Sequence, residues 1–170
     1  DRSPSRGLGD VYKRQVQAQD GVSVESDTLG ALLYPLEGDT FALDMVIKPE
    51  RYHEFGIALH VDKELETGYF LRMNPKNQLV AWDMWPRGEQ GRYQWQIKGD
   101  VPYQIETARK LPKAEEYRVH IIKEKDICVV YINDEIVLST RMYNHKDGYA
   151  GIYVVQGNVK LIQYKEKRSE

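Results

Sequence analysis

Short runs of alternating hydrophobic and polar residues follow one another along most of the chain, with turn residues about every 8–12 positions. A period of two is typical of strands that bury one face. No segment keeps a helical period of 3.6 over three turns, and Pro112 limits the best candidate, residues 110–119, to a turn. The predicted strands are GVSVES, LGALLYPL, TFALDMVIKP, FGIALHVD, GYFLRMNP, QLVAWDMWP, RYQWQI, VPYQIET, YRVHIIKE, DICVVYIND, EIVLSTRMY, YAGIYVVQ and NVKLIQYK. About a dozen short strands predict an all-β fold, a two-sheet antiparallel β-sandwich.

The clearest hairpin signal lies in residues 126–144, DICVVYINDEIVLSTRMYN. Asn133 and Asp134 tolerate positive φ and therefore predict a two-residue turn. This loop places Asp126 opposite Arg141, as a cross-strand ion pair and as candidate contacts with a partner domain. The register puts Ile127, Val129, Tyr131, Ile136, Leu138 and Met142 on the face toward the core. The other, mixed face then carries Asp126, Cys128, Val130, Val137, Ser139 and Arg141.

Composition narrows the class of protein. The chain has 170 residues, of which 41% are hydrophobic and 29% charged, as expected for a globular domain. The 12 tyrosines and 3 tryptophans favour strands further. The net charge of −2 gives no basic field for nucleic acid, and no apolar run is long enough to span a membrane. Cys128 is the single cysteine, so it forms no internal disulfide; its strand pattern predicts a buried, unreactive thiol.

The first 15 residues, DRSPSRGLGDVYKRQ, show no hydrophobic periodicity and lack the apolar segment of a signal peptide. They resemble a linker-derived translation found at the ends of proteins predicted from metagenomic assemblies. We therefore expect residues 1–15 to be a disordered, non-native tail and residues 16–170 to form a single sandwich domain of a longer protein.

Catalytic and metal-binding patterns are missing from the sequence. The histidines at positions 53, 60, 120 and 145 have no metal-ligand spacing, and no nucleotide-binding loop or nucleophile elbow is present. Glycosidases need two carboxylates across the scissile bond. The visible pairs are Glu64/Glu66, Glu115/Glu116 and Asp134/Glu135. All three stand in predicted turns or at strand ends, so we interpret them as solvated charges. The sequence predicts no catalytic residue, no metal and no cofactor.

The stretch AWDMWPRGEQGRYQW, residues 81–95, is the most suggestive local feature. Sugars bind by stacking on aromatic rings and by hydrogen bonds to acids, amides and arginine. The candidate carbohydrate-binding residues are Asp83, Trp85, Arg92, Tyr93 and Trp95. Strand alternation turns Trp82 and Met84 away from Asp83 and Trp85, so at least one tryptophan is expected in a core or a domain interface.

Three segments taken in order resemble a known family: residues 55–87, the hairpin at 126–144, and GYAGIYVVQGNVKLIQY at 148–164. Together they look like the C-terminal β-sandwich of glycoside hydrolase family 32, which includes β-fructofuranosidases, invertases and levanases. The resemblance covers residues 38–164 and implies a sandwich of the concanavalin A or laminin G type, a jelly roll. Hairpins of the form Y-x-N-x-E are common in such sandwiches, so the ordered set carries the resemblance.

That family places catalysis in an N-terminal five-bladed propeller with Asn-Asp-Pro-Asn, Arg-Asp-Pro and Glu-Cys motifs. None of these motifs occurs here: MNPKN at 73–77 lacks the aspartate, and Cys128 follows Ile127 rather than a glutamate. The resemblance therefore implies an accessory module whose partner is the catalytic propeller of a parent that hydrolyses β-fructosides such as sucrose or fructans. A free-standing, lectin-like carbohydrate-binding module is the alternative, and a complete hydrolase is a third.

Overall fold

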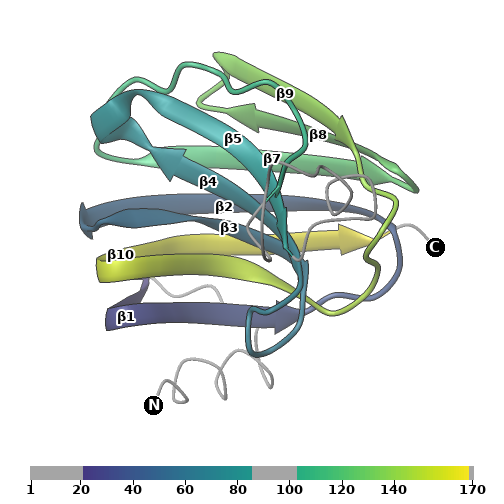
Figure 1. Cartoon of the computed structure of the whole chain (residues 1–170), viewed down its shortest axis with the longest axis horizontal. Helices are drawn as coiled ribbons and strands as arrows, with labels where there is room; N and C mark the ends of the chain where they lie inside the picture. Colours follow the sequence, from purple (N-terminus) through teal and green to yellow (C-terminus); the bar gives the residue numbers. More distant parts are fainter. Residues whose placement is uncertain (1–20, 86–102, 169–170) are drawn as a thin grey trace, which may run out of the picture.

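The computed structural model describes residues 21–85 and 103–168, and strands make up most of this part of the chain (Figure 1). Its strands are β1 (Val22–Pro35), β2 (Thr40–Arg51), β3 (Glu54–Val61), β4 (Gly68–Asn74), β5 (Leu79–Trp85), β6 (Tyr103–Gln104), β7 (Tyr117–Glu124), β8 (Ile127–Ile132), β9 (Ile136–Arg141) and β10 (Tyr149–Arg168). A 3₁₀ turn, η2 (Pro75–Asn77), links β4 to β5. No helix in this described part has the length and apolar character needed to cross a membrane.

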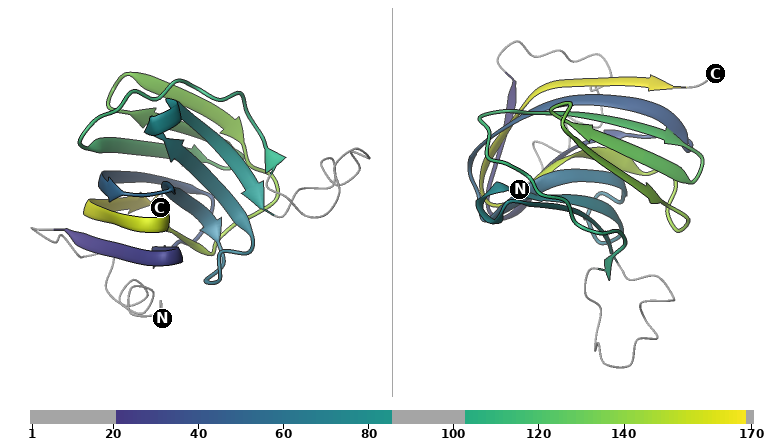
Figure 2. Two further views of the ribbon diagram at one scale, coloured as in Figure 1. Left: turned by 60° about the vertical axis from the view of Figure 1, so that its left-hand side comes forward. Right: turned by 90° about the horizontal axis from the view of Figure 1, so that it is seen from above.

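Strand β10 joins the two layers of the fold. Its residues 149–155 pair with β3, and its residues 158–168 pair with β2, in both cases antiparallel. The order of hydrogen-bonded strands is β6-β5-β4-β3-β10-β2-β7-β8-β9, and β1 runs along β10 on its other edge. The curled sheet brings β3–β6 over β7–β9, as the turned views in Figure 2 show. The predicted antiparallel β-sandwich is confirmed.

One hydrophobic core fills the space between the layers. Residues that pair across strands share a face, so the inward positions follow the register. One layer contributes Phe55, Ile57, Leu59, Tyr69, Leu71, Met73, Val80, Trp82 and Met84. The other contributes Phe41, Leu43, Met45, Ile47, Tyr117, Val119, Ile121, Cys128, Val130, Ile132 and Leu138. The expected core position of a tryptophan is confirmed, because Trp82 is fully buried.

Two pairs of predicted strands are single, longer strands. β1 covers all but the first residue of GVSVES and all but the last residue of LGALLYPL, with a register shift between Ser26 and Leu29. β10 contains both YAGIYVVQ and NVKLIQYK and bends where Gln156 adopts a φ of 51°. Each long strand serves both layers, so a bend interrupts its alternation. The predicted strand RYQWQI and the predicted tail at 1–15 lie outside the described residues.

The predicted register of the β8–β9 hairpin is wrong by one residue. The loop holds three residues rather than two: Asn133 and Asp134 have φ values of 51° and 57°, and the Glu135 amide donates to the Ile132 carbonyl over 3.0 Å. Ile127, rather than Asp126, therefore pairs with Arg141. A one-residue slip reverses the faces of one strand relative to the other. Leu138 and Met142 point inward as predicted, but on β8 the core residues are Cys128, Val130 and Ile132.

Candidate functional site

The outer face of β3, β4 and β5 carries charged side chains where the surrounding positions are apolar. Ala58, Phe70 and Asp83 form one cross-strand row, and Gly56 and Arg72 belong to the next. Arg72 and Asp83 are therefore diagonal neighbours on adjacent strands, and β10 adds Tyr153 beside Gly56. Together with Glu54 of β3, these polar side chains form a group that we call the polar group: Glu54, Arg72, Asp83 and Tyr153. All four stand on strands rather than on loops, so the sheet holds them in place.

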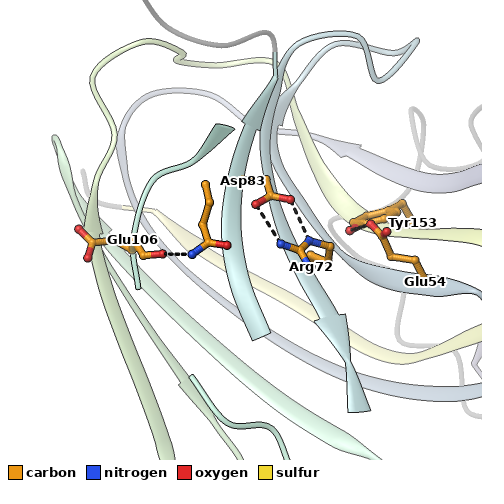
Figure 3. A network of polar contacts seen from close by, with 6 residues as sticks. Glu54, Arg72, Asp83, Glu106 and Tyr153 are labelled. Atoms are coloured by element: carbon orange, nitrogen blue, oxygen red, sulfur yellow. Dashed lines mark hydrogen bonds and ion pairs between the residues drawn. The ribbon is translucent and has the colours of Figure 1, made fainter. Parts of the chain in front are cut away.

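Arg72 and Asp83 form a two-pronged ion pair (Figure 3). The Arg72 Nε donates to Asp83 Oδ2 over 2.9 Å, and Nη2 donates to Oδ1 over 3.4 Å. Asp83 is only 8% exposed, and the hydrogen bond to its carboxylate raises the pKa of Arg72. Forked arginine–carboxylate contacts are strong and directional. The pair thus presents a fixed, recessed set of donors and acceptors.

Tyr153 and Glu54 form the second half of this polar group (Figure 3). The Tyr153 hydroxyl donates to Glu54 Oε2 over 2.9 Å. Burial, with the Glu54 carboxylate nearby, raises the Tyr153 pKa well above its ordinary value, so the phenol remains protonated. A Cβ at Gly56 would lie 1.9 Å from the Leu71 carbonyl oxygen and 3.0 Å from the Tyr153 ring. The glycine therefore allows the close approach of these strands.

Two of the five predicted carbohydrate-binding residues can be placed. Asp83 belongs to the polar group, and Trp85 is half-buried at the end of β5. Alternation puts Trp85 on the same face as Asp83, opposite Trp82, as predicted. Gln104 on β6 pairs with Asp83 and donates to the Glu106 carbonyl over 3.0 Å. Arg92, Tyr93 and Trp95 lie outside the described residues.

Sequence reasoning missed Glu54, Arg72 and Tyr153. Alternation within GYFLRMN puts Arg72 on the outer face of its strand, because its neighbours Leu71 and Met73 point inward. The sequence pattern could therefore have predicted an outward-facing charge at this position. Its pairing with Asp83 depends on the β4–β5 register. Tyr153 stands 99 positions from Glu54 in the chain, and no local pattern connects two such residues.

The opposite side of the sandwich has an exposed apolar patch. It consists of Ile122, Ile127 and Val137, which are between 42% and 47% exposed, together with the half-buried Val129. The patch is a consequence of the corrected hairpin register. Its residues Ile122, Ile127 and Val129 line a hollow of about 480 Å³, and Asp126 and Arg141 also belong to the lining of this hollow. These two predicted interface residues therefore share a surface, but they are not cross-strand partners. Arg141 pairs with Ile127, and the Asp126 carbonyl accepts a hydrogen bond from the Met142 amide.

The other sequence candidates show no catalytic grouping. The carboxylates of the three predicted pairs are all exposed. In the described part of the chain, no three histidine, cysteine or acidic side chains gather to hold a metal ion. Cys128 is fully buried, as predicted, and burial raises its pKa to about 12.

Comparison with known proteins adds information on the fold. No protein-family model matches the sequence, and no curated protein matches it either. The structure is similar to the carbohydrate binding module CBM66 from Bacillus subtilis, with a TM-score of 0.67 and 16% identity over 87% of this chain and 92% of that module. It also resembles exo-inulinase from Aspergillus awamori, with a TM-score of 0.62 and 12% identity over 97% of this chain and 31% of the enzyme. The galectin LEC-6 of Caenorhabditis elegans is similar as well, with a TM-score of 0.51 and 13% identity over 86% of this chain and 98% of the galectin. At such identities the likeness shows the fold alone, a β-sandwich that this chain shares with them.

Proposed function

We propose that this chain is a carbohydrate-binding module and that the outer face of β3–β5 binds the sugar. The recessed Arg72–Asp83 pair, beside Tyr153 and Glu54, is the observation that carries the proposal. Removing charges from water costs free energy, and apolar residues of the same size would often be at least as stabilising. A recessed charged pair on a sheet face that also carries apolar residues is therefore better explained by recognition than by stability.

The chemistry of this face suits a neutral, hydroxyl-rich ligand. Arg72 offers donors and Asp83 and Glu54 offer acceptors, so neighbouring hydroxyls of one sugar ring can both be satisfied. Trp85 and Phe70 add aromatic surface on the same strand faces. The similarity in fold to CBM66 and to a galectin supports this proposal. The family 32 resemblance and the exo-inulinase likeness favour β-fructosides as the ligand class.

A paired substitution tests the proposal. The double variant R72M/D83L replaces the ion pair by apolar side chains of similar size and should fold about as stably as the unmodified protein. Isothermal titration calorimetry with levan, inulin, xylan and galactan should detect binding to at least one polysaccharide. The double variant should bind that polysaccharide at least tenfold more weakly, whereas E115Q, in an exposed turn, should bind normally. Unchanged affinity of the double variant would refute the proposal, as would the absence of binding to all four.

The exposed patch on β7–β9 favours an additional, accessory role. The solvent face of an antiparallel sheet is normally polar, and contiguous apolar patches commonly mark interaction sites. The proposed partner is the catalytic five-bladed propeller of a parent chain that hydrolyses β-fructosides. The DNA upstream of codon 16 tests this role. An open frame that encodes Asn-Asp-Pro-Asn, Arg-Asp-Pro and Glu-Cys segments supports it, and a frame that starts directly before Val16 contradicts it.

A further inference from the structure

A polar hollow lies on the outer face of β2, β7 and β8. The Arg72–Asp83 pair lies on the outer face of the other layer, across the core. The volume of the hollow is about 420 Å³. Its polar and aromatic lining consists of Asp44, Arg118, His120, Tyr131, Asp134 and Gln163. None of the predicted site residues is among them, and the hollow is separate from the one that contains Asp126 and Arg141.

The strand register places these side chains in two adjacent rows. Asp44, His120 and Tyr131 are successive partners across β2, β7 and β8. In the next row, Gln163 of β10 and Arg118 of β7 both pair with Val46 of β2. Residues that pair across strands, and residues two positions apart along one strand, share a face. Side chains of four strands therefore converge on one spot in the body of the sheet.

Two contacts preorganise the hollow. The His120 Nδ1 is hydrogen-bonded to Asp44 Oδ1, which fixes the imidazole orientation and leaves Nε2 as the second polar atom of the ring. The Tyr131 ring lies 6.1 Å from the imidazole, at a tilt of 34°, and 37% of the residue is exposed. An open aromatic ring thus stands beside a held histidine–carboxylate pair.

Arg118 has unused binding capacity. Its backbone is held in place, because its amide donates to Asn133 Oδ1 over 2.7 Å and its carbonyl accepts from the Asn133 amide over 2.9 Å. Its guanidinium forms no hydrogen bond or ion pair with any residue of the described ranges, 21–85 and 103–168. Five N–H donors on an anchored residue are therefore available at the rim of the hollow.

We propose that this hollow is a second binding site, and that its ligand is a neutral sugar. The lining combines donors from Arg118 and Gln163 with acceptors from Asp44, and Tyr131 supplies a stacking surface. A phosphate or sulfate would meet the carboxylates of Asp44 and Asp134, and a purely apolar ligand would leave all these polar groups unpaired. A polyhydroxyl ring satisfies both kinds of group.

A second site on the far side of the core would make the domain bivalent. Because the sites face in opposite directions, one short oligosaccharide cannot occupy both, whereas a polysaccharide could be bound at two separate segments or cross-linked to another chain. Two such contacts raise the apparent affinity for polymers above that for short oligomers. The bivalency rests on the proposed function of the Arg72–Asp83 face, but the second site does not.

Titration followed by NMR of the backbone amides tests the two sites separately. The probes are tetrameric fructo-, xylo- and galacto-oligosaccharides, each added up to its solubility limit. With one of them, amides around His120 and Tyr131 should shift, with a dissociation constant distinct from that of the amides around Arg72 and Asp83. Y131A should weaken the first set about three- to tenfold and leave the second unchanged. Y131F, which keeps the ring, should bind nearly normally, and Y143A, which removes a 62% exposed tyrosine outside the hollow, is the matched control.

The possible results separate this inference from the proposed function. If the Arg72–Asp83 amides shift and the hollow stays silent, the second site is refuted and the proposed function stands. If only the hollow responds, the second site stands and the proposed function of the β3–β5 face fails. Silence of both faces with all probes refutes both. Shifts in the hollow that are the same in Y131A as in the unmodified protein would also overturn the assignment.

Discussion

Acidification should destabilise the protein through one buried histidine, His60. This residue is 2% exposed; its Nδ1 lies 2.8 Å from the Asp147 carbonyl oxygen, and its buried Nε2 has no hydrogen-bond partner among the described residues. Burial, helped by the nearby Lys123 ammonium and opposed by the hydrogen bond to the Asp147 carbonyl, lowers the pKa of His60 from 6.5 to about 4. Protonation would place a second, unpaired charge in the interior. The native imidazole is therefore neutral, and its Nδ1–H donates to Asp147.

The sign and size of the effect follow from the two pKa values. Between pH 6.5 and about 4 the unfolded chain binds a proton at His60 that the native protein does not, so the free energy of unfolding falls as the pH falls. Applied between pH 7.5 and 4.5, these pKa values correspond to a loss of about 2–3 kcal/mol in the free energy of unfolding. Above pH 6.5 this contribution to stability is fully present.

Urea unfolding followed by tryptophan fluorescence at several pH values measures this loss. Burial also lowers the pKa of His145, so acidification lowers the free energy of unfolding through this residue as well. The pH dependence of the unmodified protein must therefore be compared with that of a variant that lacks only His60. H60N is suitable because asparagine tolerates the φ of 55° at this position and can still donate to the Asp147 carbonyl. The unmodified protein should lose about 2–3 kcal/mol more than H60N over this range. Parallel pH profiles would refute the reasoning.

Three further predictions concern the core, the hairpin and the thiol. W82A should lower the free energy of unfolding by about 3–5 kcal/mol because it removes a fully buried side chain, whereas V137S, on the exposed face, should change it by less than about 0.5 kcal/mol. Equal losses for the two variants in chemical unfolding would contradict the burial pattern. N133A should lower the free energy of unfolding by about 2 kcal/mol in the same assay, because alanine disfavours positive φ and cannot accept the hydrogen bond from the Arg118 amide. E135A, in the same loop, should leave the free energy of unfolding nearly unchanged, and equal losses in the two variants would argue against the three-residue loop. Cys128 should not react with a thiol reagent at pH 8 until urea unfolds the protein; rapid labelling of the native state would show that it is accessible.

Local alternation was sufficient to predict the elements and several faces. It placed Trp82 and Asp83 on opposite faces of their strand, because side chains alternate along a strand whatever its neighbours are, and the structure shows that the Trp82 face is the inner one. It assigned the faces of β8, ICVVYI, wrongly, because both faces carry apolar residues and the loop length then decides the register. A three-residue loop buried Cys128 in place of Ile127 and produced the exposed patch.

The amino-acid sequence by itself determined that this protein is an antiparallel β-sandwich with a tryptophan in its core, since strand propensity and a period of two are properties of neighbouring residues. Only the tertiary structure decided which polar side chains meet. Arg72 reaches Asp83 through the β4–β5 register, and Tyr153 reaches Glu54 because β10 pairs with a strand almost a hundred residues earlier. Asp44 and His120 are 76 positions apart and meet only because β2 lies beside β7. The candidate sites depend on such pairings, which hydrogen bonds between distant strands establish and no local pattern encodes.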